Sequence, residues 1–195
     1  MQPYTFVFFG MFGSGKGTQI KLLMEYLKSK YHKEVVYAGT GEGLRNLLSL
    51  ENDTSTVVKD YMMRGELIPD FLVTSLVTNT FISNLTPDKV IFMDGYPRTV
   101  AQAGVFESMM KFFNRNNIKF IYIELSKEEA VRRNSLRGRA DDTLDSFNKR
   151  YEEHVNNEIL AMSYFENKEG YEVFKINGEK SIEEVHKDII NTLKI

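Results

Sequence analysis

The sequence contains no cysteine, and this absence removes several kinds of chemistry. Without thiols, the 195 residues cannot form a disulfide bond, present a cysteine nucleophile or build a zinc site from thiolates. The three histidines, His32, His154 and His186, lie apart in polar surroundings, and none has the spacing of a metal ligand. We therefore interpret all three as solvent-exposed side chains, and we expect no zinc.

Long apolar runs and an excess of charge are also missing. No apolar stretch approaches the roughly 18 residues of a membrane-spanning helix, and the first residues lack the basic-then-apolar order of a signal peptide. Lysine and arginine number 25 against 27 aspartate and glutamate, so no broad positive field attracts nucleic acid or an anionic membrane. These absences favour a soluble cytoplasmic protein that binds neither nucleic acid nor a membrane.

Five short apolar segments are spread along the chain and are typical of strands buried on both faces. They span residues 6–9, 35–38, 90–93, 120–123 and 173–176, with helical patterns between them. Strands that alternate with helices predict a single α/β domain with a five-stranded parallel sheet between two layers of helices. Ligands of such sheets bind beyond the carboxyl ends of the strands, so the residues that follow each strand are the candidate site.

A glycine-rich segment follows the first apolar run and reads Gly10-Met11-Phe12-Gly13-Ser14-Gly15-Lys16-Gly17-Thr18. Apolar residues at helical spacing continue from Ile20 to Leu27. A strand, a glycine turn and a helix in this order predict a phosphate-binding loop, whose N–H groups and lysine hold a nucleotide phosphate. The strict motif has Ser or Thr directly after the lysine, whereas here Gly17 intervenes. The alternative interpretation is an ordinary glycine-rich turn with a surface lysine.

The segments after the second and third strands carry the next candidates. Residues 40–69 are long for a crossover and contain two short helical patterns, so we expect a small helical insert that ends where Asp70 caps the next helix. Asp94 ends the third apolar run, where it can hold the water shell of magnesium or be a plain turn residue. Gln102 either contacts a ligand or closes a capping box with the backbone N–H of Thr99.

Arginines gather around a glycine after the fourth strand, as Arg133, Arg137, Arg139 and Arg150. Guanidinium groups bind phosphate oxygens through two parallel hydrogen bonds, so four of them predict a phosphate site with a short flap at 136–142. The alternative is a set of surface ion pairs with Asp141, Asp142 and Asp145. The helix beyond this flap has an apolar stripe that runs from Leu144 through Val155 to Met162.

In their residues and in their order along the chain, these segments resemble the nucleoside monophosphate kinase family, and most closely its adenylate kinases with short lids. Five segments carry the resemblance. With the family motif that each one resembles in parentheses, they are Gly10–Gln19 (GxPGxGKGTQ), Thr40–Arg45 (TGDxLR), Gly65–Asp70 (GxLVPD), Asp94–Gln102 (DGFPRTxxQ) and Gly138–Asp142 (GRxDD). The resemblance covers nearly the whole chain. It implies a phosphate-loop fold with a core of residues 1–39, 70–135 and 143–195, an insert for the nucleoside monophosphate at 40–69 and a short lid at 136–142.

The resemblance also implies a reaction and a set of site residues. The reaction is the reversible, magnesium-dependent transfer of the ATP γ-phosphoryl group to AMP, which gives two ADP in a monomeric enzyme. Donor contacts would come from Gly13, Ser14, Gly15, Lys16, Gly17, Thr18, Arg133, Arg137 and Lys180. AMP contacts would come from Thr40, Gly41, Arg45, Glu66, Leu67, Ile68, Gly95, Tyr96, Pro97, Arg98, Gln102, Arg139 and Arg150. The catalytic set would be Lys16, Arg98, Arg133, Arg137, Arg139 and Arg150. Asp94 would hold magnesium through water, and Thr18 is a second candidate.

The chain departs from the family pattern at several positions. Phe12 stands where the family has proline, which removes a fixed φ from the loop. Glu42 replaces aspartate, Gly43 replaces a large apolar residue, and Tyr96 replaces phenylalanine. These changes touch the acceptor side, so a kinase for UMP, CMP or another monophosphate is an alternative function. A second alternative is a nucleotide sensor without catalysis.

Overall fold

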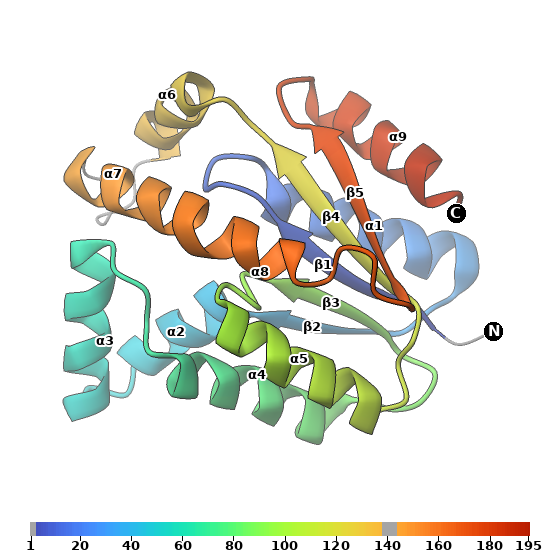
Figure 1. The fold of residues 1–195 in the computed structure, drawn as a ribbon, viewed down its shortest axis with the longest axis horizontal. Helices are drawn as coiled ribbons and strands as arrows, with labels where there is room; N and C mark the ends of the chain where they lie inside the picture. The colour runs from blue at the N-terminus through green and yellow to red at the C-terminus, as the bar shows by residue number, and fades with distance from the viewer. Residues whose placement is uncertain (1–2, 138–143) are drawn as a thin grey trace.

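The computed structural model describes residues 3–137 and 144–195, and a parallel sheet forms its centre (Figure 1). The strands are β1 (Thr5–Phe9), β2 (Val35–Gly39), β3 (Val90–Asp94), β4 (Ile118–Glu124) and β5 (Tyr171–Asn177). They lie in the order β2-β3-β1-β4-β5, and every neighbouring pair is parallel. The predicted α/β fold and all five predicted strands are confirmed, and each strand extends past its apolar core by one to three residues.

Register brings the ends of β1, β2 and β3 to one edge of the sheet. Phe8, near the end of β1, is opposite Asp94 of β3. Gly39, the last residue of β2, is opposite Asp94, the last residue of β3. The segments that follow β1, β2 and β3 therefore leave the sheet side by side, as the parallel arrangement requires.

The helices between the strands have the following bounds. They are α1 (Lys16–Tyr31), α2 (Thr40–Leu48), α3 (Asp53–Arg64), α4 (Asp70–Asn84), α5 (Val100–Phe112), α6 (Lys127–Arg137), α7 (Leu144–Glu153), a π-helical turn η1 (His154–Glu158), α8 (Ile159–Ser163) and α9 (Ile182–Leu193). The segment between β2 and α4 contains the two expected helices, and the first of them begins at Thr40, directly after β2.

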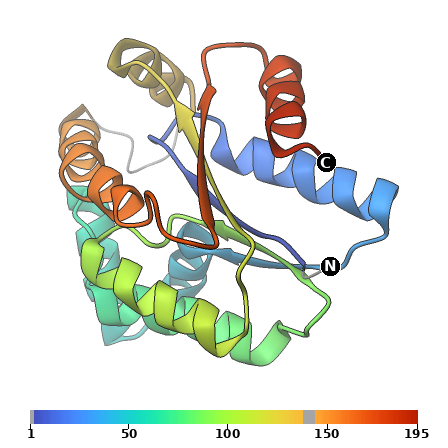
Figure 2. The ribbon, with the colours of Figure 1, turned by 45° about the vertical axis from the view of Figure 1, so that its right-hand side comes forward.

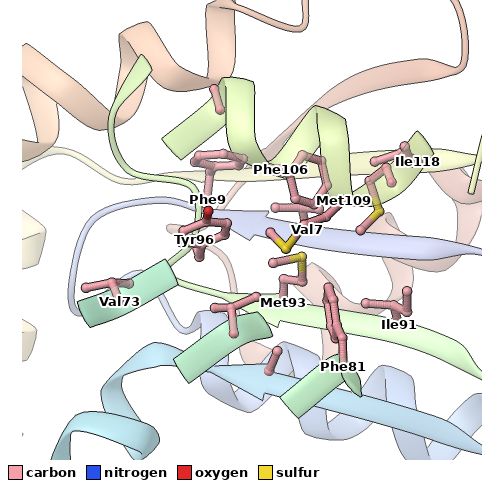
Figure 3. Packing of buried hydrophobic residues seen from close by; sticks show 14 of the residues in the cluster. Val7, Phe9, Val73, Phe81, Ile91, Met93, Tyr96, Phe106, Met109 and Ile118 are labelled. Carbon is pink, nitrogen blue, oxygen red and sulfur yellow. The ribbon is translucent and has the colours of Figure 1, made fainter. Parts of the chain in front are cut away.

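Helices cover both faces of the sheet, so the core has two layers (Figure 2). On one face, α1 and α9 bury residues such as Leu23 and Ile189 against Phe6 and Phe92 of the strands. The other face packs against α4, α5 and α8. Figure 3 shows this second layer, in which Phe81 of α4 and Phe106 of α5 enclose side chains of β1 and β3. The alternating directions of strand side chains explain why neighbouring residues enter different layers.

One local prediction about a helix start is wrong. Asp70 is not the cap of α4, because Pro69 occupies that position and the Asp70 carboxylate instead accepts hydrogen bonds from α5 and its cap. Asp70 therefore ties α4 to α5.

The alternative in which Gln102 closes a capping box is only half realised. Its backbone N–H donates to the Thr99 hydroxyl at 3.1 Å, but its side-chain oxygen accepts the backbone N–H of Arg98 and not that of Thr99.

Within residues 3–137 and 144–195, none of the helices combines the length and apolar character needed to cross a membrane.

Candidate active site

A hollow of about 1060 Å³ opens at the carboxyl edge of the sheet. Segments far apart in the sequence line it: the glycine-rich loop, the end of β2 with α2, the turn before α4, the end of β3 and the helix α7–η1. Most of the predicted site residues are among its lining. They are Gly13, Gly15, Lys16, Gly17, Thr18, Thr40, Gly41, Arg45, Glu66, Leu67, Ile68, Asp94, Gly95, Arg98, Gln102, Arg133 and Arg150.

Four predicted site residues do not line the hollow. Ser14 and Tyr96 are buried beneath it, and the Tyr96 hydroxyl lies 3.2 Å from that of Thr74. Pro97 follows Tyr96 through a cis peptide bond. Lys180 lies between β5 and α9, where its ammonium pairs with Asp188 at 2.7 Å. Arg139, with residues 138–142 of the expected lid 136–142, lies outside the described residues, and so does the side chain of Arg137.

The glycine-rich loop wraps around its own lysine. The Lys16 ammonium donates to the carbonyl of Gly10 and, at 3.1 Å, to that of Met11. Gly10 has a φ of +135°, and a Cβ there would lie 2.5 Å from the carbonyl oxygen of Ile123. Only glycine fits this position, because L side chains avoid this φ and the β4 backbone fills the space. The fold therefore presents Lys16 and the N-terminus of α1 to the hollow together.

The ends of β2 and β3 are joined by hydrogen bonds. The Thr40 hydroxyl lies 3.2 Å from the carbonyl of Asp94 and 3.1 Å from that of Gly95. The phenol of Tyr37 lies 3.5 Å from the Asp94 carboxylate. Burial and the negative charge of Asp94 raise the pKa of Tyr37 above its ordinary value, so the phenol stays protonated.

Oxygen donors for magnesium are present at this edge. The Asp94 carboxylate and the Thr18 hydroxyl both line the hollow. Across the described residues, no group of three His, Asp or Glu side chains could hold a metal without help. The donors present suit a magnesium ion that keeps most of its waters and shares phosphate oxygens with a nucleotide.

Arg98 and Gln102 are fixed by a chain of hydrogen bonds. The Arg98 side chain donates from Nε to the carbonyl of Gly95 at 3.0 Å. Its backbone N–H donates to Oε1 of Gln102 at 2.7 Å, and Nε2 of Gln102 donates to the Asp70 carboxylate at 2.8 Å. Gln102 is only 3% exposed, yet it lines the hollow. Each end of its amide keeps one unused hydrogen-bonding position, since an amide has two N–H donors and two lone pairs.

Two of the arginines have neighbours that the sequence did not suggest. Arg133 donates to Glu129 at 2.6 Å within α6, and Arg132 shares the same carboxylate. These hydrogen bonds lower the pKa of Glu129 to about 2. Arg150 lies 4.6 Å above the ring of Phe12, which in turn makes an edge contact with Phe147. The loop residue that departs from the family pattern thus packs beneath a predicted catalytic arginine.

The helix that continues from α7 through η1 buries different side chains from those that the sequence predicts. The sequence predicts that Val155 continues the apolar stripe and that His154 is exposed, and both predictions are wrong. Val155 is 42% exposed, whereas His154 is 5% and Glu158 7% exposed. Phe147, His154, Glu158 and Ala161 are all buried, and their spacings of seven, four and three residues place them on one continuous helical face. The only sequence signal for this pair was the spacing of four residues between a histidine and a glutamate.

Glu158 is an ionised carboxylate beside the glycine-rich loop. Burial opposes ionisation, but the hydrogen bond from His154 and the positive charges of Arg98 and Lys16 outweigh it and lower the pKa of Glu158 to about 2. Its Oε1 accepts the backbone N–H of Gly10 at 3.2 Å. Glu158 and His154 line the hollow and have no counterpart among the predicted site residues.

Comparisons with known proteins agree with the geometry. A family model described as "Adenylate kinase" matches residues 8–170. Curated adenylate kinases are similar over nearly the whole chain. The protein of Parabacteroides distasonis is 30% identical and the alignment covers 96% of this chain and 98% of the relative. That of Prochlorococcus marinus is 31% identical with 94% of each chain covered, and adenylate kinase 1 of a Nostoc species is 28% identical with 96% and 97% covered.

Proposed function

The chain belongs to the adenylate kinase family and is a nucleoside monophosphate kinase, and from this premise we propose that it transfers the γ-phosphoryl group of magnesium-bound ATP to AMP. The observation that supports this reaction best is the meeting of two sets of groups in one hollow. The glycine-rich loop with Lys16 forms one wall, and Arg45, Arg98 and Gln102 form another.

The donor phosphates bind at the loop. Its N–H groups and the N-terminus of α1 attract negative charge, and Lys16 exchanges its carbonyl partners at Gly10 and Met11 for phosphate oxygens. Arg133 and Arg150 line the same space. Arg137 is proposed to contact the donor phosphates as well. Asp94, through water, and Thr18 are the residues that would hold magnesium. When bound, the ion would supply neutralisation of the phosphate charge.

The acceptor binds between α2 and the end of β3. Thr40, Gly41, Arg45 and the backbone of 66–68 surround it, and Arg98 with Gly95 binds its phosphate, to which Arg139 and Arg150 also reach. Gln102 reads adenine with the N–H and the lone pair that Asp70 and the Arg98 backbone leave unused. These two positions match an acceptor and a donor that lie side by side on the base.

The transfer itself needs charge stabilisation and in-line positioning, and no side chain acts as an essential general base. The arginines neutralise the transferring group. The insert 40–69 and the lid 136–142 close over the nucleotides and exclude water, which would otherwise accept the phosphoryl group. We also propose that the enzyme acts as a monomer.

An acceptor panel tests the proposal. ADP is measured after ATP and magnesium are mixed with AMP, UMP, CMP or GMP in turn. We expect the highest kcat/KM with AMP. A preference for a pyrimidine nucleotide would contradict Gln102 as the reader of adenine, and binding of ATP without ADP formation from any acceptor would favour the sensor.

A further inference from the structure

A buried pair on η1 connects the sheet to the glycine-rich loop. The Tyr122 hydroxyl of β4 lies 3.3 Å from Nε2 of His154. Nδ1 of His154 lies 3.0 Å from Oε2 of Glu158, and the other carboxylate oxygen accepts the N–H of Gly10. The ionised carboxylate only accepts hydrogen bonds, so Nδ1 is the donor and Tyr122 completes the other ring nitrogen. Both oxygens of Glu158 are thus engaged in a fixed orientation.

Gly10 is held from two sides by this arrangement. Its N–H donates to Glu158, and its carbonyl accepts from the Lys16 ammonium. Gly10 is buried, and a buried backbone N–H requires an acceptor. The pairing of β1 with its neighbouring strands ends at Phe9, the residue before Gly10. Glu158 therefore satisfies the first N–H of the loop beyond the strand.

We propose that Glu158, oriented by His154, is a positioning residue that holds Gly10 and thereby places the loop amides and Lys16 for the donor phosphates. The proposal rests on the proposed kinase function. Among the described residues, Glu158 accepts a hydrogen bond from the loop backbone and forms none with the residues predicted to bind AMP. Its loss should therefore weaken ATP binding more than AMP binding. Because its role is to accept a hydrogen bond, glutamine at this position should preserve most of that binding.

Three variants test the proposal, with ATP binding measured by calorimetry in the absence of any acceptor, and KM measured separately for ATP and AMP. For Glu158→Leu we expect the Kd and KM for ATP to rise about tenfold, the usual effect of losing a hydrogen bond to a charged group, and the KM for AMP less than about threefold. Glu158→Gln should stay within about threefold of the unmodified enzyme for ATP, since the amide oxygen still accepts the Gly10 N–H.

Glu107→Gln is the matched control. This carboxylate, like that of Glu158, accepts two hydrogen bonds, here from Tyr164 at 2.8 Å and Lys168 at 2.9 Å, but it is not part of the hollow. We expect it to change thermal stability and to leave ATP binding unchanged. Unchanged ATP binding therefore distinguishes a variant that only loses stability from a variant in which the loop is displaced.

Two results would overturn the proposal. One is an unchanged affinity for ATP in Glu158→Leu, and the other is an affinity for ATP in Glu158→Gln as low as that of the leucine variant. If Glu158→Leu does not fold, His154→Phe replaces it, because that variant keeps the carboxylate and removes its orienting donor. An ATP affinity within twofold of the unmodified enzyme in His154→Phe would then overturn it. The affinity for ATP is measured without any monophosphate, so it does not depend on which acceptor the enzyme uses. Failure of this proposal is therefore distinguishable from failure of the proposed reaction with AMP.

Discussion

Phe12 offers the sharpest test of how the loop and the arginines cooperate. Its ring makes an edge contact with Phe147, with centroids 4.7 Å apart, and lies 4.6 Å from the Arg150 guanidinium. Phe147 is buried in a small cluster with Met11 and Ala130. Phe12→Leu keeps an apolar side chain at this position but removes both ring contacts, so it separates the aromatic geometry from hydrophobic burial.

The size of the effect follows from the two contacts. An aromatic edge pair contributes about 0.5–1.5 kcal/mol beyond its burial, and a half-exposed cation–π contact contributes about 0.5–1 kcal/mol. We therefore expect Phe12→Leu to lose about 1–2.5 kcal/mol of folding free energy, which lowers the Tm by roughly 3–8 °C for a chain of this size. If the cation–π part also holds Arg150 for the reaction, kcat should fall about two- to fivefold.

The assay measures kcat at saturating ATP and AMP together with the Tm by calorimetry. Phe147→Leu is the control, since it removes the same edge contact and leaves the Phe12 ring beneath Arg150. It should lower the Tm and keep kcat within about 1.5-fold, because the cation–π contact persists. Unchanged kcat in Phe12→Leu, or an equal loss of kcat in both variants, would refute a role of Phe12 in holding Arg150.

Three further predictions concern other parts of the chain. Arg98→Ala should lower kcat/KM at least about 100-fold, because a charged donor to the transferring group is lost, and a circular dichroism spectrum like that of the unmodified enzyme would exclude misfolding. Gly43→Ala should raise the Tm by about 2–4 °C, since glycine within α2 costs about 1 kcal/mol and the new Cβ meets only the flexible end of Leu76 at 3.3 Å; a lower Tm would show that Leu76 cannot move. The hydrogen bonds from Lys168 and Tyr164 lower the pKa of Glu107 to about 2, so the stability from this carboxylate is fully present above the unfolded pKa near 4.5 and is lost as the pH falls toward 2. Urea unfolding should therefore show that Glu107→Gln loses less stability than the unmodified protein between pH 4.5 and pH 2, and parallel curves would contradict this.

The sequence alone predicted the parts of this protein that depend on local order. Continuous apolar runs indicated the five buried strands, because a strand covered on both faces has no polar side. The glycine-rich loop was recognisable because the position of Gly10 admits no other residue. The family followed from several such segments in one order, and the family model matches the same region.

Tertiary structure decided which polar side chains meet. Asp70 was expected to cap a helix, but the packing of α4 against α5 brings it to Gln102 instead. His154 and Glu158 are buried against the loop, where Val155 was expected to be. Neither outcome could be predicted from the sequence, because the spacing of apolar residues contains no information about which polar side chains a neighbouring segment buries or about which helix lies opposite.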